Sequence, residues 1–240
     1  GHLDGDRPAG DRQAHRHHAN VGAVALSSAD REGRRRPSAR VEHHHHFVNA
    51  HGNVFNGDIR CGKIIWQQDR PKVANYPTPA ILKVAGRTQA VLGGCGLVAS
   101  FDPLTGKKLW EIEGSTDETV VMAVTDGKRV FVSGGYPKNN MTAVEANGSG
   151  KIAWQNNVRL YVPSMLVRDG YLFAMLDTGQ AVCWQADTGE EVWREKVDKD
   201  YYASPVLVGD RFYATSLRGV TSVFEASAQK FGKLLSQNQL

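Results

Sequence analysis

Short apolar runs alternate with glycine-containing turns from about residue 53 onward. Each unit has an apolar run, a turn such as Asp126-Gly127, two further runs of about five residues, and a turn leading to a segment with a tryptophan. Asp-Gly between apolar runs is typical of a β-hairpin, because glycine accepts a positive φ. No segment has a convincing helical period. The pattern therefore predicts short antiparallel strands joined by tight turns.

The units recur at a nearly constant spacing. The tryptophans that end them are Trp66, Trp110, Trp154 and Trp193, at intervals of 44, 44 and 39 residues. Four short strands in a repeat of roughly 40 residues are the sequence signature of a β-propeller blade. An immunoglobulin-like sandwich also has short strands, but it does not repeat in this way. We therefore predict an all-β chain folded as a β-propeller of four-stranded antiparallel blades.

The repeats also predict the domain boundaries. Residues 53–69 correspond to half a blade, and four blades follow to about residue 236 within a domain of residues 53–240. The last blade is degenerate, with Leu234 or Leu235 expected at the tryptophan position. Propellers use about 4–8 blades, and an unpaired blade edge favours aggregation. We therefore expect these repeats to be the C-terminal part of a larger ring.

Residues 1–52 differ in composition from the rest. All nine histidines lie at or before His51, including the run His43 to His46, and the first 50 residues contain eight arginines and no lysine. Burying so few apolar residues does not release enough free energy to offset the entropy cost of ordering the segment. We expect a disordered segment or an artefact, such as an expression remnant or a stretch translated in a wrong frame. A metal-binding histidine tract is the alternative. No signal peptide is visible.

Charge and cysteine content exclude several classes of protein. After residue 50, 21 basic residues face 19 acidic ones, and no basic stripe interleaved with aromatics favours nucleic-acid binding. No apolar run is long enough for a transmembrane helix. Cys61, Cys95 and Cys183 form no CxxC motif, so zinc-ribbon and thioredoxin-like sites are unsupported. We expect these cysteines to be buried apolar residues.

Candidate chemistry is sparse. No histidine follows His51, which excludes a Ser-His-Asp or Cys-His arrangement and a histidine-ligated metal within the repeats. Gly94-Cys95-Gly96 fits part of a dinucleotide fingerprint, but the segment leads into a predicted strand instead of the required helix. We expect no catalytic residues and no metal site in this part of the chain.

The stretch from Ser100 to Trp110 carries a family resemblance. Asp102, Thr105, Gly106 and Trp110 match almost completely the recurring Ala-x-Asp-x-x-Thr-Gly-x-x-x-Trp segment of the pyrroloquinoline-quinone (PQQ)-like repeat β-propellers. The Trp193 copy has Gln185 in place of Asp. The Trp154 copy has Glu145 in that place and one extra residue before Gly150. The resemblance covers residues 53–236 and implies that each tryptophan packs against the turn of the next blade.

The family resemblance also implies two classes of function. Quinoprotein dehydrogenases of this kind hold PQQ and calcium at the ring centre, whereas BamB-like members are periplasmic scaffolds that bind partners. Without a recognisable ligand cluster, we expect a non-catalytic binding or scaffold module, periplasmic or secreted, that binds a protein or a small extracellular ligand at the propeller face. The alternative is a fragment of a PQQ-dependent dehydrogenase that oxidises an alcohol or a sugar, with PQQ and calcium as cofactors.

Any cofactor-binding or ligand site should lie at the ring centre, where the innermost strands begin. The polar and aromatic residues expected there are Asn75, Tyr76, Thr119, Tyr161 and Tyr202. Tyrosines at such positions also pack the start of a strand while their hydroxyl groups face water.

Overall fold

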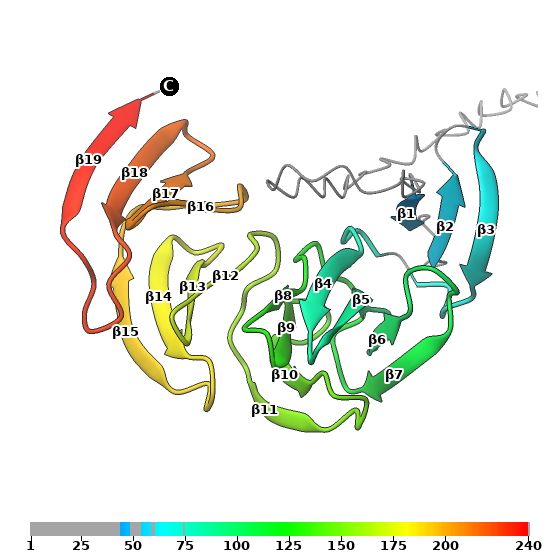
Figure 1. Ribbon diagram of the computed structural model, residues 1–240. Coiled ribbons are helices and arrows are strands. Elements are labelled where there is room, and N and C mark those ends of the chain that lie inside the picture. The colour runs from blue at the N-terminus through cyan, green and yellow to red at the C-terminus, as the bar shows by residue number, and fades with distance from the viewer. Residues whose placement is uncertain (1–43, 49–53, 59–60, 74, 240) are drawn as a thin grey trace, which may run out of the picture.

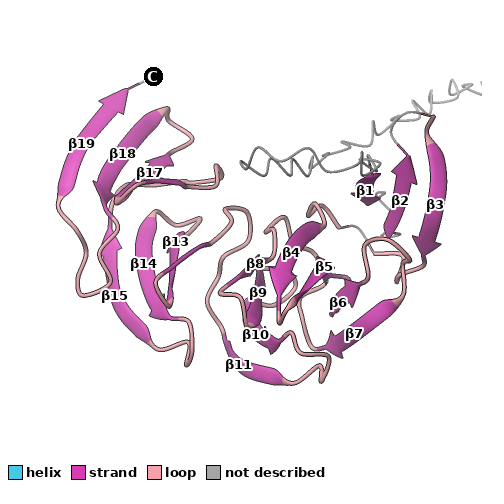
Figure 2. Cartoon of the chain, in the orientation of Figure 1, coloured by secondary structure: helices cyan, strands magenta, loops and turns pink. Residues whose placement is uncertain are grey.

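The computed structural model describes residues 44–48, 54–58, 61–73 and 75–239. All regular structure in these residues is β-strand, arranged as five antiparallel sheets that follow one another in chain order (Figure 2). The sheets form an open arc of blades (Figure 1). The predicted all-β propeller of four-stranded blades is therefore confirmed.

We number the blades 1 to 5 in chain order. Blade 1 consists of β1 (His44–Val48), β2 (Val54–Asp58) and β3 (Lys63–Gln68). Blade 2 consists of β4 (Ala80–Val84), β5 (Arg87–Gly94), β6 (Leu97–Phe101) and β7 (Lys108–Glu113). Blade 3 consists of β8 (Val124–Thr125), β9 (Arg129–Gly134), β10 (Asn140–Glu145) and β11 (Ile152–Asn156). Blade 4 consists of β12 (Leu166–Arg168), β13 (Tyr171–Met175), β14 (Gln180–Gln185) and β15 (Glu191–Lys196). Blade 5 consists of β16 (Val206–Val208), β17 (Arg211–Thr215), β18 (Val220–Glu225) and β19 (Leu234–Gln239).

Each complete blade is a simple meander. The strands pair in chain order, so that β4, β8, β12 and β16 are innermost and β7, β11, β15 and β19 are outermost (Figure 1).

In the described residues no helix is long and apolar enough to cross a membrane.

The N-terminal segment is described only in part. Strand β1 pairs with β2, from His44 with Asp58 to Val48 with Val54, so blade 1 begins before the boundary predicted at residue 53. The other residues of the predicted 1–52 segment lie outside the described part of the chain, and its origin stays a prediction.

The innermost strands are shorter than the apolar runs that predicted them. The run expected from Thr119, for example, becomes strand only at Val124–Thr125. The earlier residues bond across blades instead: the Tyr76 amide donates to the Thr119 carbonyl oxygen at 3.2 Å, and the Val120 amide donates to the Tyr161 carbonyl oxygen at 3.3 Å. These bonds link neighbouring blades around the inner side of the arc.

The hydrophobic core lies between the blades. Phe131 and Met141 of blade 3 pack with Leu172 and Trp184 of blade 4 in one buried cluster. Similar clusters join blades 1 and 2, blades 2 and 3, and blades 4 and 5. Each blade is therefore stabilised mainly by its neighbours, as expected for stacked repeats.

Two tryptophans dock on the next blade in the same way. The Trp66 indole Nε1–H donates to the Pro103 carbonyl oxygen at 3.0 Å, and Trp154 donates to that of Ala186 at 2.9 Å. A Cβ added to Gly106 would lie 2.6 Å from the Trp66 ring, and one added to Gly189 would lie 2.6 Å from the Trp154 ring. Both glycines also have φ near +70°. The inter-blade role implied for these tryptophans is confirmed.

Trp110 departs from this arrangement. Its indole donates to the Gln89 Oε1 atom of its own blade at 2.7 Å, and the Gln89 amide group donates to the Ala146 carbonyl oxygen of blade 3 at 2.9 Å. Because the blade 3 turn has one extra residue before Gly150, this glycine does not face the Trp110 ring. It faces the Glu111 carbonyl oxygen instead. A buried glutamine therefore relays the inter-blade bond.

The last docking contact uses a longer turn. Trp193 donates to the Ser227 carbonyl oxygen at 2.9 Å, and its ring meets Phe231 edge-on at a centroid distance of 5.4 Å. In blade 5 itself, the residue that pairs with Val223 is Ser236, just as Trp193 pairs with Cys183. The tryptophan position of blade 5 is therefore Ser236, and the expectation of Leu234 or Leu235 was wrong.

The cause of that error is a bulge that recurs in every blade. The pairing between the third and outermost strands shifts by one residue just before the tryptophan position. The residues left unpaired by these shifts are Ile65, Leu109, Ala153, Val192 and Leu235. A bulge bends its strand and strengthens the local twist.

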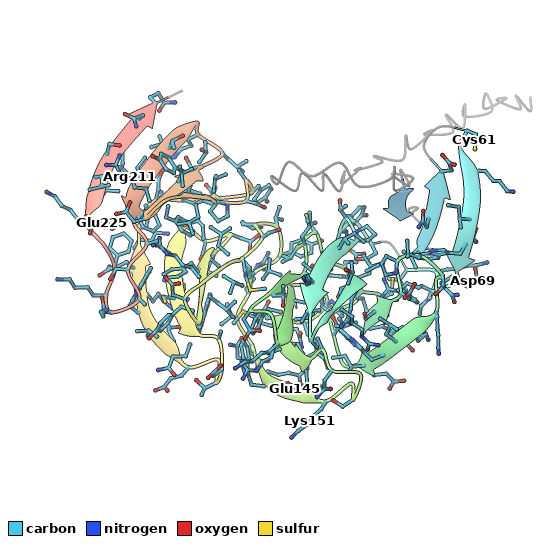
Figure 3. All side chains as sticks on the ribbon, viewed as in Figure 1. Cys61, Asp69, Glu145, Lys151, Arg211 and Glu225 are labelled. Atoms are coloured by element: carbon cyan, nitrogen blue, oxygen red, sulfur yellow. The ribbon has the colours of Figure 1, made fainter. Side chains whose placement is uncertain are left out.

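The cysteines follow the expectation only in part. Cys95 and Cys183 are buried, and burial raises the pKa of the Cys183 thiol to about 12. Cys61 is exposed, because it lies in the turn between β2 and β3 at one end of the arc (Figure 3).

The glycine contact can be tested by comparing two substitutions. Gly106 and Gly86 have φ of +73° and +78°, but only Gly106 faces a tryptophan. We expect Gly86→Ala to cost about 1–2 kcal/mol of folding free energy through backbone strain alone. Gly106→Ala should cost roughly 1–3 kcal/mol more, because the methyl group displaces the Trp66 ring. Urea unfolding of both variants measures the difference, and equal losses would contradict the docking contact.

Trp110 should be essential for stability although its bond is relayed. It is 5% exposed in the core between blades 2 and 3. We expect Trp110→Ala to cost about 3–5 kcal/mol of unfolding free energy. Trp110→Phe retains much of the packing but leaves Gln89 without the indole donor, so a smaller loss of about 1–3 kcal/mol is expected. Denaturant titration tests this order, and the reverse order would refute it.

Candidate functional site

The candidate residues lie on one face of the arc. In a meander of four strands, the start of the innermost strand and the loop between the second and third strands are at the same end. We call this end the tyrosine face and the opposite end, which carries the docking turns, the turn face. Backbone bonds tie the tyrosine face together: the Tyr76 amide donates to the Thr119 carbonyl oxygen at 3.2 Å between blades 2 and 3, and the Glu118 amide donates to the Tyr136 carbonyl oxygen at 3.1 Å within blade 3.

The register divides the five predicted residues into two sets. Counted back from the first residue of each innermost strand, the fifth position holds Asn75, Thr119, Tyr161 and Tyr201. The fourth position holds Tyr76, Val120, Val162 and Tyr202. Sequence reasoning treated members of the two sets as equivalent and missed Tyr201. The signal that separates them is the distance to the innermost strand, which the apolar runs alone do not define.

Side chains at the fifth position are turned into the blade. The Asn75 Nδ2 group donates to the Gly93 carbonyl oxygen at 2.8 Å, and the Thr119 hydroxyl donates to the equivalent Ser133 carbonyl oxygen at 2.6 Å. Both side chains are buried. Tyr201 is fully buried, with its hydroxyl 3.4 Å from that of Ser222. Asn75 and Thr119 therefore hold the start of the innermost strand against the second strand, whereas Tyr201 reaches the third strand.

Tyr161 is the half-buried member of that set. Its hydroxyl donates to the Glu118 Oε2 atom at 3.4 Å, and its amide donates to the Asp177 carboxylate at 2.9 Å. Burial, followed by the negative charge of Glu118, raises the pKa of the Tyr161 phenol. A phenol with its usual pKa near 10 is already protonated at neutral pH, and the raised pKa extends its ability to donate a hydrogen bond to more alkaline pH.

The two tyrosines at the fourth position point to solvent, whereas Val120 and Val162 are half-buried. Tyr76 is 60% exposed and Tyr202 is 54% exposed. Two residues that sequence reasoning missed join them from the loops between second and third strands: Tyr136, 57% exposed, and Leu217, 60% exposed. The tyrosine face therefore presents exposed aromatic and aliphatic side chains from blades 2, 3 and 5.

A buried arginine also lies at this end of blade 2. The Arg70 Nη2 group donates to the Gly94 carbonyl oxygen at 2.8 Å, while its Nε and Nη1 atoms have no partner among the residues that the structure describes. Burial lowers the pKa of the Arg70 guanidinium, and the charges of Cys95 and then Glu111 act in the opposite direction. Sequence reasoning missed Arg70, and nothing in its local pattern marks it as buried.

The candidate residues do not form a calcium or PQQ site. Calcium takes six to eight oxygen ligands, usually with several carboxylates. The described ranges contain no group of three or more His, Cys, Asp or Glu side chains that could hold a metal ion. The Asn75 and Thr119 side chains are also engaged within their blades. The residues present therefore do not fit the cofactor pair of a quinoprotein.

One pocket lies away from the predicted residues. It has a volume of about 420 Å³ on the turn face between blades 4 and 5, and it is lined by residues that include Arg168, Asp169, Tyr171 and Glu225. Arg168 is already occupied there, because its guanidinium bonds the Gly209 carbonyl oxygen and the Asp169 carboxylate. The pocket results from the long turn of blade 5.

The raised pKa of Tyr161 predicts a loss of stability at alkaline pH. Because the folded pKa exceeds the usual value near 10, the stabilising contribution is complete below pH ~10 and is lost as the pH rises through the folded pKa. Tyr161→Phe should therefore lose less stability than the unmodified chain between pH 9 and pH 11. Urea midpoints at both pH values measure this, and an identical drop in the two proteins would contradict it.

Comparison with known proteins supports a PQQ-like fold. The BamB structure from Moraxella catarrhalis matches with a TM-score of 0.66 at 17% identity, over 82% of this chain and 61% of that chain. The quinohemoprotein alcohol dehydrogenase ADHIIG from Pseudomonas putida HK5 matches with a TM-score of 0.61 at 17% identity, over 83% of this chain and 41% of that one. Sqt1 from Saccharomyces cerevisiae matches with a TM-score of 0.65 at 11% identity, over 82% of this chain and 58% of that chain. At these identities the likeness shows the fold alone.

The chain spans about three fifths of the BamB structure and two fifths of the dehydrogenase. No curated protein sequence matches it. The family model described as outer membrane protein assembly factor BamB matches residues 19–174 and 137–230. Together these ranges cover most of the sequence, so the chain belongs to this BamB-like family of PQQ repeats.

Proposed function

We propose that this propeller is a non-catalytic, protein-binding scaffold module that acts in the periplasm or outside the cell. Membership of the BamB-like family supports export and a scaffold role. A protein partner is favoured over a small extracellular ligand because the exposed side chains are spread over several blades and not gathered in a pocket.

The observation that carries this proposal is the set of exposed side chains on the tyrosine face. Tyr76, Tyr136 and Tyr202 are each more than half exposed. Tyrosine is enriched at protein interfaces, because it offers a large rigid surface with a polar end at a low entropy cost. The backbone beneath is held by bonds between blades, so the face is rigid before any partner binds.

The alternative is a part of a PQQ-dependent dehydrogenase for alcohols or sugars. The similarity to quinohemoprotein alcohol dehydrogenases favours it. The donor set of the described residues does not support it. A fluorescence titration of the chain with PQQ and calcium separates the two functions. Tight stoichiometric binding, or dye-linked oxidation of an alcohol or sugar, would overturn the scaffold proposal.

Partner binding should depend on the tyrosine face and not on the turn face. A photo-crosslinking amino acid at Tyr76, Tyr136 or Tyr202, in cells of the natural source, should capture one discrete partner. The matched control is Leu104, which is 61% exposed but lies on the turn face. With the captured partner in hand, we expect each Tyr→Ala variant to bind about tenfold more weakly and Leu104→Ala to bind unchanged. Equal capture from Leu104 would contradict the assignment.

A further inference from the structure

The junction between blades 3 and 4 shows how this fold holds a guanidinium group between two blades. The Arg129 guanidinium lies 2.9 Å from the Asp126 carboxylate and 3.5 Å from the Glu145 carboxylate, both in its own blade. It also bonds the Asp187 carboxylate, in the docking turn of blade 4, at 2.7 Å. One cation near the start of a second strand is thus surrounded by carboxylates from both blades.

The next junction has carboxylates from both blades but lacks that cation. Tyr171 is the residue of blade 4 that corresponds to Arg129, because Tyr171 pairs with Gln185 as Arg129 pairs with Glu145. Tyr171 lines the pocket of about 420 Å³ between blades 4 and 5. Three acidic residues, one from blade 4 and two from blade 5, also line it: Asp169, Asp210 and Glu225.

Two of these acidic residues are available to a ligand. In the part of the chain that the structure describes, the side chains of Asp210 and Glu225 form no hydrogen bond or ion pair. Asp169 is 3.2 Å from the Arg168 guanidinium, which is the basic group of the lining. Arg211 pairs with Glu225 in the ladder of β17 and β18, but it does not line the pocket. Negative charge therefore exceeds positive charge in the lining.

This arrangement suits a guanidinium group better than a metal ion. Oxygen ligands must converge within about 2.6 Å of a calcium ion, and no group of three or more acidic, His or Cys side chains in the described ranges could hold a metal. A guanidinium carries five N–H donors on a planar fork, so it can bond carboxylates that lie apart. Tyr171 and Phe173 add aromatic walls, on which a guanidinium packs favourably.

We propose that the pocket between blades 4 and 5 binds the guanidinium group of an arginine side chain that another polypeptide presents. At this junction the bound group takes the place that Arg129 takes at the preceding one. An arginine within a polypeptide is favoured over the free amino acid. The Nη1 and Nε groups of Arg168 already bond the Gly209 carbonyl oxygen and Asp169, so Arg168 is poorly placed to hold a free α-carboxylate. The pocket lies on the turn face, and its test does not depend on the scaffold proposal for the tyrosine face.

Small arginine derivatives test the pocket on the full chain. The probe is N-acetyl-arginine amide, which resembles an arginine residue within a polypeptide. The matched control is N-acetyl-citrulline amide, which has nearly the same shape and no charge. In nuclear magnetic resonance titrations we expect saturable binding of the arginine derivative at millimolar concentration. The citrulline derivative should bind about tenfold more weakly or less, because hydrogen bonds to a charged group are lost. Free arginine should bind no more tightly than the blocked amide.

A charge variant locates the binding. Asp210→Asn combined with Glu225→Gln removes the two available carboxylates, so the affinity for the arginine derivative should fall about tenfold or more. The control combines Glu190→Gln with Glu195→Gln, which makes the same change of charge at exposed residues outside the lining. At physiological ionic strength such distant charges are screened, so the control should bind unchanged.

A third variant tests the equivalence of the two junctions. Tyr171→Arg places a guanidinium in the pocket from within the chain, as Arg129 does at the preceding junction, so the arginine derivative should no longer bind. Urea unfolding establishes that each variant is folded. Five results would each overturn the proposal: no saturable binding of the arginine derivative, equal binding of the citrulline derivative, tighter binding of free arginine, unchanged binding after Asp210→Asn with Glu225→Gln, or unchanged binding after Tyr171→Arg.

Discussion

The contact of an indole ring with the turn of the following blade is the interaction on which the rest of this structure depends. It combines a hydrogen bond from Nε1 to a backbone carbonyl with close packing on a glycine. Since the hydrophobic clusters lie between blades, a blade without this contact would leave much of its apolar surface in water. The glycine must be bare and must adopt a left-handed conformation, which explains why the motif pairs Gly with Trp at a fixed spacing.

The contact tolerates variation when a second polar group compensates for it. One extra residue in the blade 3 turn removes Gly150 from the ring, and buried Gln89 replaces the missing bond by accepting from Trp110 and donating to Ala146. At the equivalent place in blade 3, Arg129 bonds Asp187 of blade 4 at 2.7 Å. In blade 4 the equivalent residue is Tyr171, and the long turn of blade 5 leaves a pocket there. The residue at this position of the second strand therefore differs from blade to blade, together with the turn of the following blade that it faces.

The propeller fold could be predicted from the sequence because its determinants are local and periodic. Asp-Gly turns, short apolar runs and the tryptophan spacing each define part of a blade. The candidate site was less predictable. Whether a residue lies four or five positions before an innermost strand decides between exposed Tyr202 and buried Tyr201, and that strand is only three residues long. Before this strand the chain bonds to the neighbouring blade instead, as the Tyr201 amide does to the Asp177 carbonyl oxygen, and no local pattern encodes such bonds. The bulge before Ser236 made the tryptophan-equivalent position of blade 5 equally hard to predict. No feature of the sequence marks Leu235 as the residue that stays unpaired.

The recurrent bulge has a consequence for solubility. The outermost strand of each blade is a sheet edge with unpaired backbone groups, and five such edges on one molecule invite strand addition by other molecules. A bulge near the start of every outermost strand breaks the straight hydrogen-bonding ladder and twists the edge away from a flat partner. Charged side chains along these edges, including the ion pairs Lys108–Glu111 and Arg194–Glu191, reinforce the protection. The bulge that precedes every tryptophan position therefore also keeps the outer rim of the described blades from seeding intermolecular β-sheet.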